Sequence, residues 1–424
     1  MTNRILLNNL LIAILIFSYL LVCKKASNEN NEHNLIEQKD EPDIDEEIFP
    51  TQITKPEIKL LVGDWAEIPK KRKVDNSDYA FLDFEDNYYT KISFYSNMIY
   101  KDVSGFQTQI GNSMGPDMNL GNKTVFQIIG NELQIFDLRK SNWVRQKILK
   151  LDSQSLVLKS EQGKIVKYKK LQPNKNLNPD FEKIIFSSSK CFGTCPVMDI
   201  IVSANGDVVF YGERFNLTEG IYSGKISPKK YKEILDDFRF FDIQKSEGYA
   251  TPGTDQQTRT ITFIHNNKIY KTIRDYGHAA PSELKWGYTI LQSLYQKMKL
   301  RDISLYSLPI YNQLKNFEIR KGDKTYYLEK SESFYLWDLL RKGKITKENF
   351  TPIYILDYEK ESYWQKEGEY AFNSRVEEVK TIKLCETDGR FFKFSFFNKD
   401  SVTIDIGFDF FKDFNLDEKF KHGL

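Results

Sequence analysis

Short runs of residues that alternate between apolar and polar side chains fill residues 58–171, and they constrain the fold more than any other feature of the chain. Such alternation has the period of a β-strand with one buried face, and no helix-length period interrupts it. Turn dipeptides, among them Gly130-Asn131 and Gln162-Gly163, separate the runs. We therefore predict a meander of roughly eight strands over 56–171, which forms an up-and-down barrel or a curled sheet.

A Gly-x-Trp sequence, Gly63-Asp64-Trp65, lies on the first of these runs. It resembles the start of the lipocalin-like domains of bacterial envelope lipoproteins, in which the tryptophan plugs one end of the barrel. The resemblance leaves two alternatives, a barrel that holds a small apolar ligand or a filled core in which Trp65 is packing. We favour packing, because small barrels are usually filled by their own side chains. The Gly-rich, polar stretch 105–122 is predicted to be a mobile loop over one mouth.

The composition is that of a β-rich chain with several domains. The 424 residues are too many for one ordinary core, and the 31 Phe, 24 Tyr and 5 Trp favour strands. The 61 Lys and Arg nearly balance the 59 Asp and Glu, for a net charge of +2. No segment approaches a polybasic block, so we expect no nucleic-acid partner.

The first 23 residues resemble a bacterial lipoprotein signal, because Arg4 precedes an apolar stretch over 10–22 and Cys23 follows it. The resemblance implies that Cys23 is lipidated and becomes the N-terminus. The alternative is an uncleaved membrane anchor over 5–22, whose 18 residues are within the roughly 17–25 that span a bilayer. Two lysines directly follow Cys23, which is the wrong end of the apolar stretch for an anchor whose N-terminus lies inside the cell. Both interpretations place the folded part in the cell envelope, outside the cytoplasm.

Residues 24–55 combine nine acidic residues with four lysines, a net charge of 4 − 9 = −5. They contain many asparagines, almost no aromatic residues and no apolar period, so the segment cannot bury enough surface to become ordered. We predict a disordered acidic tether. Its acidic stretch lacks the glycine turn and the regular oxygen spacing of a calcium-binding loop, so we predict no metal site there.

A new pattern begins after a linker that is rich in proline and amide side chains. Apolar alternation on both sides of Asn205-Gly206 and of Asn266-Asn267 predicts two hairpins. Ser227-Pro228 supplies an N-cap and a proline at the first helical position, and Pro281 opens a second helix. The order is three strands, a helix, two strands and a helix. It predicts an α+β domain over 180–300 with helices on one sheet face.

Four stretches of this region carry a family resemblance: KCFGTCPVMDIIVSANGDVVFYGER, GKISPKKYKEIL, TPGTDQQTRTITF and RDYGHAAP. Together they resemble the bacterial domain-of-unknown-function family 6438, which is found in envelope lipoproteins. The resemblance implies no known activity. Asp255, Asp275 and Tyr276 match polar positions that recur in the family, but we interpret the two carboxylates as local backbone acceptors. We therefore predict no catalytic residue.

Cys191 and Cys195 are four positions apart in the sequence CFGTCP. Gly193 lets the loop bend, and Cα atoms at this spacing can reach the roughly 4.4–6.8 Å that a disulfide requires. The pair also resembles the copper site of envelope copper chaperones, in which a helix follows the cysteines. Here a hairpin follows, and the spacing brings neither His265 nor His278 to the pair. We predict a disulfide, as expected in an oxidising compartment, with a redox or copper-binding role as the alternative.

Residues 301–424 predict a second α+β domain or an extension of the preceding sheet. A short helix is expected from Ser331, with Gly343 as its cap, and a hairpin at Asp388-Gly389. Cys385 is interpreted as an inert, partly buried thiol.

The fold class that we predict is a β-rich, multi-domain α+β chain. Its parts are a lipoprotein-type signal 1–23, a tether 24–55, a lipocalin-like β domain 56–171, an α+β domain 180–300 and a C-terminal α+β domain 301–424. The chain has four histidines, His33, His265, His278 and His422. It shows no Ser-His-Asp context, His-rich metal motif or phosphate-binding glycine loop.

These features favour a non-enzymatic envelope lipoprotein, without a cofactor, that is tied to a membrane by a lipid on Cys23 and binds an unknown envelope protein. The alternative is a carrier of a small apolar ligand in the N-terminal barrel.

Overall fold

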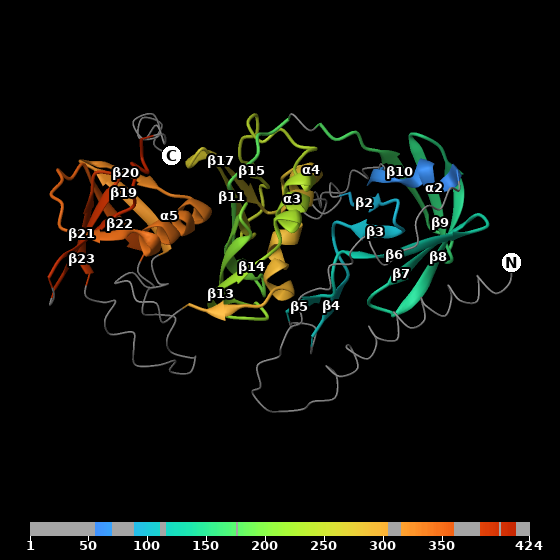
Figure 1. The fold of residues 1–424 in the computed structure, drawn as a ribbon, viewed down its shortest axis with the longest axis horizontal. Coiled ribbons are helices and arrows are strands. Elements are labelled where there is room, and N and C mark those ends of the chain that lie inside the picture. The colour runs from blue at the N-terminus through green and yellow to red at the C-terminus, as the bar shows by residue number, and fades with distance from the viewer. Residues whose placement is uncertain are drawn as a thin grey trace, which may run out of the picture. The chain divides into compact units, whose positions relative to one another are not determined.

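The computed structural model describes residues 56–69, 89–110, 116–174, 177–303, 315–359, 382–397 and 400–412. Within these residues three large sheets follow one another along the chain (Figure 1). The predicted signal, Cys23 and the predicted tether lie outside the described residues. No helix in the described part of the chain is long and apolar enough to cross a membrane.

The first sheet is a closed barrel of antiparallel strands, as predicted. In hydrogen-bonded order its eight strands are β1 (Gly63–Glu67), β10 (Ile165–Lys170), β9 (Ser155–Ser160), β8 (Asn142–Leu151), β7 (Glu132–Asp137), β6 (Lys123–Ile129), β3 (Ile99–Asp102) and β2 (Lys91–Phe94). β1 pairs with both β10 and β2, and this double pairing closes the sheet.

Buried side chains of the chain itself pack together in the barrel core. Trp65 has no exposed surface, and its Nε1 donates a hydrogen bond to the Leu61 carbonyl at 2.7 Å. Leu61 ends a short helix, α2 (Pro56–Leu61), that the sequence prediction lacks. The other buried members of this core are Ile58, Ile92, Phe94, Tyr100, Phe106, Phe126, Ile128, Leu133, Ile135, Leu156 and Leu158. Trp65 is therefore a packing residue.

The stretch 105–122 differs from the mobile loop that its composition predicts. Its described residues include a hairpin of β4 (Gln107–Gln109) and β5 (Asp117–Asn119). The backbone N–H of Asn119 donates to Oε1 of Gln296 at 2.7 Å. For these described residues an irregular loop was therefore the wrong expectation, because polar residues can be ordered by contacts that are distant in sequence; residues 111–115 lie outside the described residues.

The second sheet has eight strands and contains a central strand that the sequence prediction lacks. The strands are, in hydrogen-bonded order, β15 (Tyr249–Ala250), β17 (Lys268–Tyr276), β16 (Thr258–His265), β11 (Lys183–Ser188), β12 (Val197–Ser203), β13 (Asp207–Arg214), β14 (Gly220–Lys225) and β18 (Arg301–Asp302). β11 was missed because its short apolar run does not alternate, which is typical of a strand buried on both faces.

The two helices of this region lie on one face of the second sheet. α3 (Pro228–Asp237) begins as predicted, with Oγ of Ser227 accepting from the Lys230 N–H at 3.1 Å. α4 (Ser282–Thr289) follows Pro281 and continues as 3-10 turns over Ile290–Gln292 and Leu294–Lys297. Side chains of both helices share one core with β11, β12 and β16.

The third sheet is separate from the second, so the alternative of a sheet extension was wrong. Its strands, in hydrogen-bonded order, are β20 (Lys324–Tyr327), β19 (Lys315–Lys321), β22 (Tyr354–Glu359), β23 (Ile382–Thr387), β24 (Phe391–Phe396), β25 (Val402–Asp405) and β21 (Lys344–Thr346). The helix α5 (Lys330–Lys342) ends at Gly343, as predicted.

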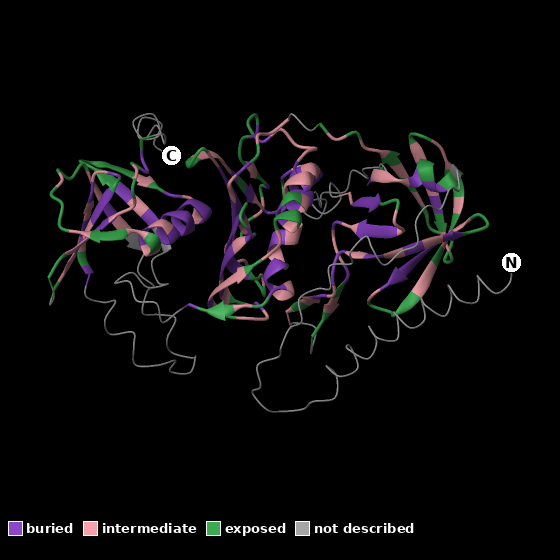
Figure 2. Cartoon of the chain, viewed as in Figure 1, coloured by how far each residue is buried: buried purple, intermediate pink, exposed green. Residues whose placement is uncertain are grey.

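The helix α5 packs against the second sheet as well as the third. Figure 2 shows it buried along most of its length. Its Phe334, Tyr335 and Leu336 share a core with five side chains of the second sheet, Ile185, Ile201, Val209, Ile221 and Ile264. The second sheet therefore has α3 and α4 on one face and α5 on the other.

Candidate functional site

Three loops that are far apart in the sequence meet at one end of the second sheet. They are the loop 189–196 before β12, the loop 251–257 before β16 and the loop 277–281 after β17. Each contains residues of one of the stretches that carry the family resemblance. The fold thus brings three of those four stretches together, and we call this place the three-loop site.

Hydrogen bonds around Gln257 hold the three loops together. Its Nε2 donates to the carbonyls of Ser189 at 3.0 Å and Pro196 at 2.8 Å, and its own carbonyl accepts from the Gly277 N–H at 3.0 Å. Gly277 has a φ of +67°, and a Cβ there would lie 2.0 Å from Cγ2 of Thr251. A glycine at this position is what allows the second and third loops to approach each other.

The predicted disulfide pair is in the first of these loops. The structure places the Sγ atoms of Cys191 and Cys195 at bonding distance, with their Cα atoms 5.8 Å apart. The loop presents Phe192, which is 90% exposed. Cys385 is a buried free thiol on β23, and burial raises its pKa well above its ordinary value.

A buried guanidinium lies beside these loops. The strand register places Arg259 of β16 between Ser188 of β11 and Asp275 of β17. Arg259 is 8% exposed, and its Nε and Nη1 make no hydrogen bond in the described part of the protein. A buried donor without a partner carries a desolvation cost of about 1–3 kcal/mol, and a charged donor carries more. Thr251 of the second loop also has a buried Oγ1 without a hydrogen-bond partner, so Arg259 is the charged side chain of this site whose bonding is incomplete.

The neighbouring carboxylate of Asp275, by contrast, has a hydrogen-bond donor for each of its oxygens. Asp275 is 2% exposed, and its Oδ1 accepts from the Ala280 N–H at 2.9 Å. Its Oδ2 accepts from the Tyr288 hydroxyl at 2.6 Å. Asp275 is thus a local backbone acceptor, as predicted, and it also binds Tyr288 near the end of α4.

Positive charge predominates around Arg259. Lys285 of α4 is 3% exposed, and burial lowers its pKa, an effect that Asp275 opposes and Arg259 strengthens. Burial likewise lowers the pKa of Arg259, although a guanidinium stays charged at neutral pH. Desolvation, followed by the positive charges of Arg259 and Lys285, lowers the pKa of His278 to about 3. The site therefore combines two buried cations with one carboxylate and a neutral imidazole.

The structure gives the other candidate residues different roles. Asp255 has a φ of +60°, and it is its backbone carbonyl, not its carboxylate, that accepts a backbone hydrogen bond, from the Phe192 N–H at 2.9 Å. The expectation of a side-chain acceptor was wrong for Asp255, because the left-handed turn directs its carbonyl toward the disulfide loop. The hydroxyl of Tyr276 accepts from the Gln256 N–H at 3.2 Å.

Of the histidines, His278 belongs to the third loop of the site, and His265 lies away from the cysteine pair. His265 is at the opposite end of β16 from the three loops, with Nδ1 2.9 Å from the Asp180 carbonyl oxygen. His33 and His422 lie outside the described residues. Within the described ranges, no group of three or more His, Cys, Asp or Glu side chains is placed to hold a metal ion.

Arg259 was not among the residues predicted from the sequence, although a signal was present. In TRTITFIH, Arg259 has the same parity as Ile261 and Phe263, which point into the core beneath α3. A cation at an inward position of an alternating strand marks a buried charge. The strand register places Asp275 beside this charge, and the packing of α4 adds the interaction with Lys285, so neither could be predicted from the strand sequence alone.

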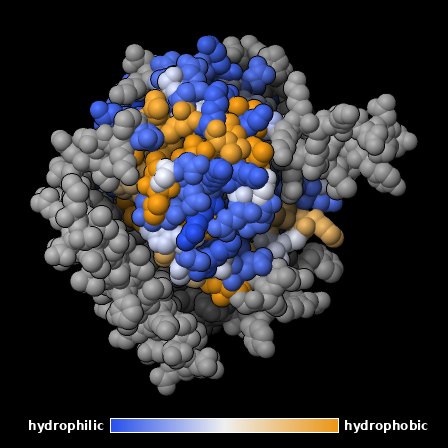
Figure 3. Space-filling model, turned by 90° about the vertical axis from the view of Figure 1, so that its right-hand side faces the viewer, coloured by the Kyte–Doolittle hydropathy of each residue, from blue (hydrophilic) through white to orange (hydrophobic). Residues whose placement is uncertain are grey.

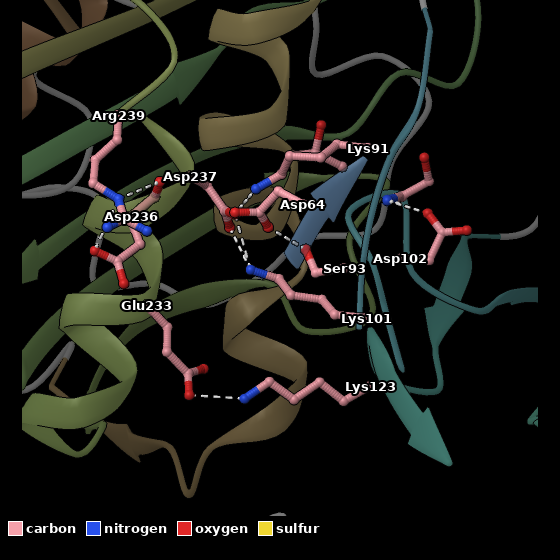
Figure 4. Close-up of polar contacts among 12 residues, drawn as sticks. Asp64, Lys91, Ser93, Lys101, Asp102, Lys123, Glu233, Asp236, Asp237 and Arg239 are labelled. Carbon is pink, nitrogen blue, oxygen red and sulfur yellow. Dashed lines mark hydrogen bonds and ion pairs between the residues drawn. The ribbon is translucent and has the colours of Figure 1, made fainter. Parts of the chain in front are cut away.

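A second buried charged cluster joins the barrel to α3 (Figure 4). Asp237, the last residue of α3, accepts from Nζ of Lys91 at 2.5 Å and from Nζ of Lys101 at 2.8 and 2.9 Å. All three residues are at most 5% exposed. Burial alone would raise the pKa of Asp237, but Lys101 and Lys91 hold it below its ordinary value. A third ion pair, between Lys123 and Glu233 at 2.7 Å, lies at the edge of this contact.

Comparison with known proteins identifies one part of the chain. Residues 182–295 match the family described as a domain of unknown function, DUF6438, and this confirms the resemblance for these residues. The match covers the three loops, Arg259 and both helices of the second sheet. No curated protein and no solved structure matches the chain.

Proposed function

We propose that this chain is a binding protein whose three-loop site takes up a carboxylate group of its ligand or partner. The observation that carries the proposal is the Arg259 guanidinium, which is buried with Nε and Nη1 unbonded in the described residues. An anion that accepts from the Nε–H or from an Nη1–H would remove part of the cost of leaving these donors unpaired. Both atoms are shielded from solvent, so binding requires a local opening of the loops.

The local charge balance favours a carboxylate over a phosphate. Among the buried groups of the site, Arg259 and Lys285 contribute two positive charges and Asp275 one negative charge, which leaves a single positive charge to be neutralised. A carboxylate supplies one negative charge, whereas a phosphate group carries about 1.5–2 at neutral pH. The planar guanidinium matches the geometry of carboxylates and phosphates alike, so the charge balance is what favours the carboxylate.

The function proposed is binding without a reaction. Both oxygens of Asp275 are engaged in hydrogen bonds to the fold, so this carboxylate acts as a structural acceptor. The alternative, an apolar ligand in the barrel, is less well supported, because aromatic and aliphatic side chains such as Trp65, Phe94 and Phe126 are packed in the barrel core.

Cell-envelope localisation, with a lipid on Cys23 as the membrane anchor, is part of the same proposal. It is supported by the signal-like sequence before Cys23 and by the cysteine pair at disulfide distance, which suits an oxidising compartment. Metabolic labelling with a fatty acid should mark the wild type and not Cys23→Ser. Equal labelling of both proteins would refute the anchor and leave the carboxylate site untouched.

The carboxylate site can be tested by thermal unfolding of the full chain. Acetate and succinate, at constant ionic strength, should raise the midpoint of the wild type more than phosphate does. Arg259→Met should abolish this rise, whereas Arg301→Met, at an exposed arginine of the same sheet, should retain it. An equal rise in Arg259→Met, or no preference for carboxylates over phosphate, would refute the proposal.

A further inference from the structure

The outer face of three barrel strands collects an excess of positive charge. Residues 142–171 contain eight Lys or Arg and two acidic residues, a net charge of 8 − 2 = +6. The register of β8, β9 and β10 aligns Lys147 with Lys159, Lys159 with Ile165, and Val157 with Lys167. Residues that face each other across antiparallel strands lie on the same side of the sheet, and here that side is the outside of the barrel.

We call this surface the basic face. It consists of seven exposed cations, Arg145, Lys147, Lys150, Lys159, Lys164, Lys167 and Lys169. Lys150 pairs with Asp152 at 3.0 Å, and Lys169 lies over the Tyr89 ring. The other five make no ion pair with any residue that the structure describes.

One feature distinguishes this surface from an ordinary solvated strand face with alternating charges. Lys147 and Lys159 are directly opposite each other, and like charges in that position destabilise a sheet. Glu132 faces Lys147 from β7 and is the acidic residue at this margin. Apart from this pair at the margin, the registers of β8, β9 and β10 place no acidic residue opposite a lysine of the basic face.

Aliphatic side chains stand among these cations. Leu149 and Ile165, on β8 and β10, are 46% and 39% exposed, and Ile129 at the end of β6 is 54% exposed. Figure 3 faces the barrel side of the molecule and shows hydrophobic residues next to hydrophilic ones on this surface. Cations with interspersed aliphatic residues are the combination by which peripheral proteins bind the headgroup region of a bilayer.

We propose that the basic face docks on the surface of an anionic lipid bilayer. The cations would contact the lipid phosphates, and Leu149, Ile165 and Ile129 would contact the acyl boundary. This inference does not depend on the carboxylate site or on a lipid at Cys23, because it rests on the charges and exposure of barrel residues alone.

A bilayer suits the arrangement better than the acidic segment 24–55 of the chain itself. The cations extend along β8 from Arg145 to Lys150 and across three strands, a width of about 10 Å. They therefore form a two-dimensional array. An extended acidic segment would neutralise one row of such an array, whereas a lipid surface presents phosphates in both directions.

Lysine acylation of the full chain, read by mass spectrometry, tests this docking directly. Vesicles that contain phosphatidylglycerol should protect Lys147, Lys159, Lys164 and Lys167, and vesicles of phosphatidylcholine should not. Lys229, Lys299 and Lys324, which are exposed elsewhere, serve as internal controls and should react equally in both. Protection without vesicles that is lost when the acids of 24–55 are replaced by amides would identify that segment as the occupant and refute the proposal. Protection by duplex DNA but not by vesicles would also refute it.

Charge reversal gives a second measurement. At about 1 kcal/mol for each basic residue near an anionic surface, K147E/K159E/K167E should weaken binding to these vesicles roughly 100-fold. The matched variant K229E/K299E/K324E has the same change in net charge and should bind as the wild type does. Equal weakening in both variants would mean that net charge alone acts, and the basic face would then have no special role.

Discussion

Two buried charged clusters in this molecule are built in opposite ways. At the contact between the barrel and α3, Asp237 accepts three hydrogen bonds from Lys91 and Lys101. In the three-loop site, Arg259 is nearly as deeply buried, but its Nε and Nη1 have no partner among the described residues. Burial of a charge therefore does not by itself indicate function. The incomplete bonding of Arg259 is what points to a ligand, whereas the completed set around Asp237 points to a structural joint.

The largest expected effect follows from breaking the completed cluster. Asp237→Asn leaves two buried ammonium groups without their counter-charge, so it should lower the free energy of unfolding by about 3–5 kcal/mol. Denaturant unfolding measures this loss, and Asp236→Asn on the more exposed neighbour is the control. A loss no larger than that of the control would contradict the assignment of Asp237 as a structural joint.

The same cluster predicts a pH dependence. The folded-state pKa of Asp237 is below its ordinary value, so the stabilisation that it provides is present above the unfolded pKa of about 3.9 and is lost as the pH falls through the folded pKa. Wild-type stability should therefore decline more steeply below about pH 4 than that of Asp237→Asn. Parallel curves for the two proteins in that range would show that Asp237 is not a source of the acid sensitivity.

Removal of Arg259, the incompletely bonded charge, should stabilise the protein, whereas removal of the Asp237 charge destabilises it. Arg259→Met replaces buried, unpaired donors with an apolar chain of similar length, so without ligand it should raise the free energy of unfolding by about 1–3 kcal/mol. The same denaturant titration measures the gain. A loss comparable to that of Asp237→Asn would mean that Arg259 is a structural partner, and the contrast between the clusters would disappear.

The cysteine pair tests how far the three-loop site depends on its first loop. Cys191→Ser with Cys195→Ser should lower stability by about 2 kcal/mol or less, because the closed loop is short. It should weaken carboxylate binding while leaving the Asp237 cluster intact. Thiol titration of denatured, unreduced protein that lacks Cys23 should find one reactive thiol, Cys385. Three thiols would refute the disulfide.

The smallest expected effect is at the edge of the barrel contact. Glu233→Gln breaks the pair with Lys123, and both side chains are about a quarter to a third exposed, at 26% and 30%. Partly solvated pairs contribute little, so the change should be below about 1 kcal/mol. A loss as large as that of Asp237→Asn would show that solvent exposure does not separate the two ion pairs.

Local signals in the sequence were sufficient for much of the fold. Asn266 and Asn267 both adopt left-handed φ values, 54° and 59°, in the two-residue turn that their identity predicts. Ser227-Pro228 begins a helix for equally local reasons. The strand β11 was not predicted, because its run KIIFSS has no alternation. Only its pairing with β12 on one side and β16 on the other defines it as a strand.

The basic face and the surroundings of Arg259, in contrast, could be recognised only once the register of the strands was known. Lysines at every second or third position look like a solvated strand face, and only the alignment of β8, β9 and β10 gathers them into a basic face. The same is true of Arg259, whose neighbours Ser188 and Asp275 are more than ten residues away in sequence. A single strand contains too little information to define either surface.

The position of α5 has a consequence for how the protein can be dissected. The matched region 182–295 ends before α5, yet Ile185, Ile201, Val209, Ile221 and Ile264 of its sheet are covered by a core to which that helix belongs. An excised fragment with those limits would expose an apolar sheet face to water, and such faces promote self-association. The stretch of sequence that a family shares and the smallest piece that folds alone are therefore different objects in this chain, and the second extends at least through residue 342.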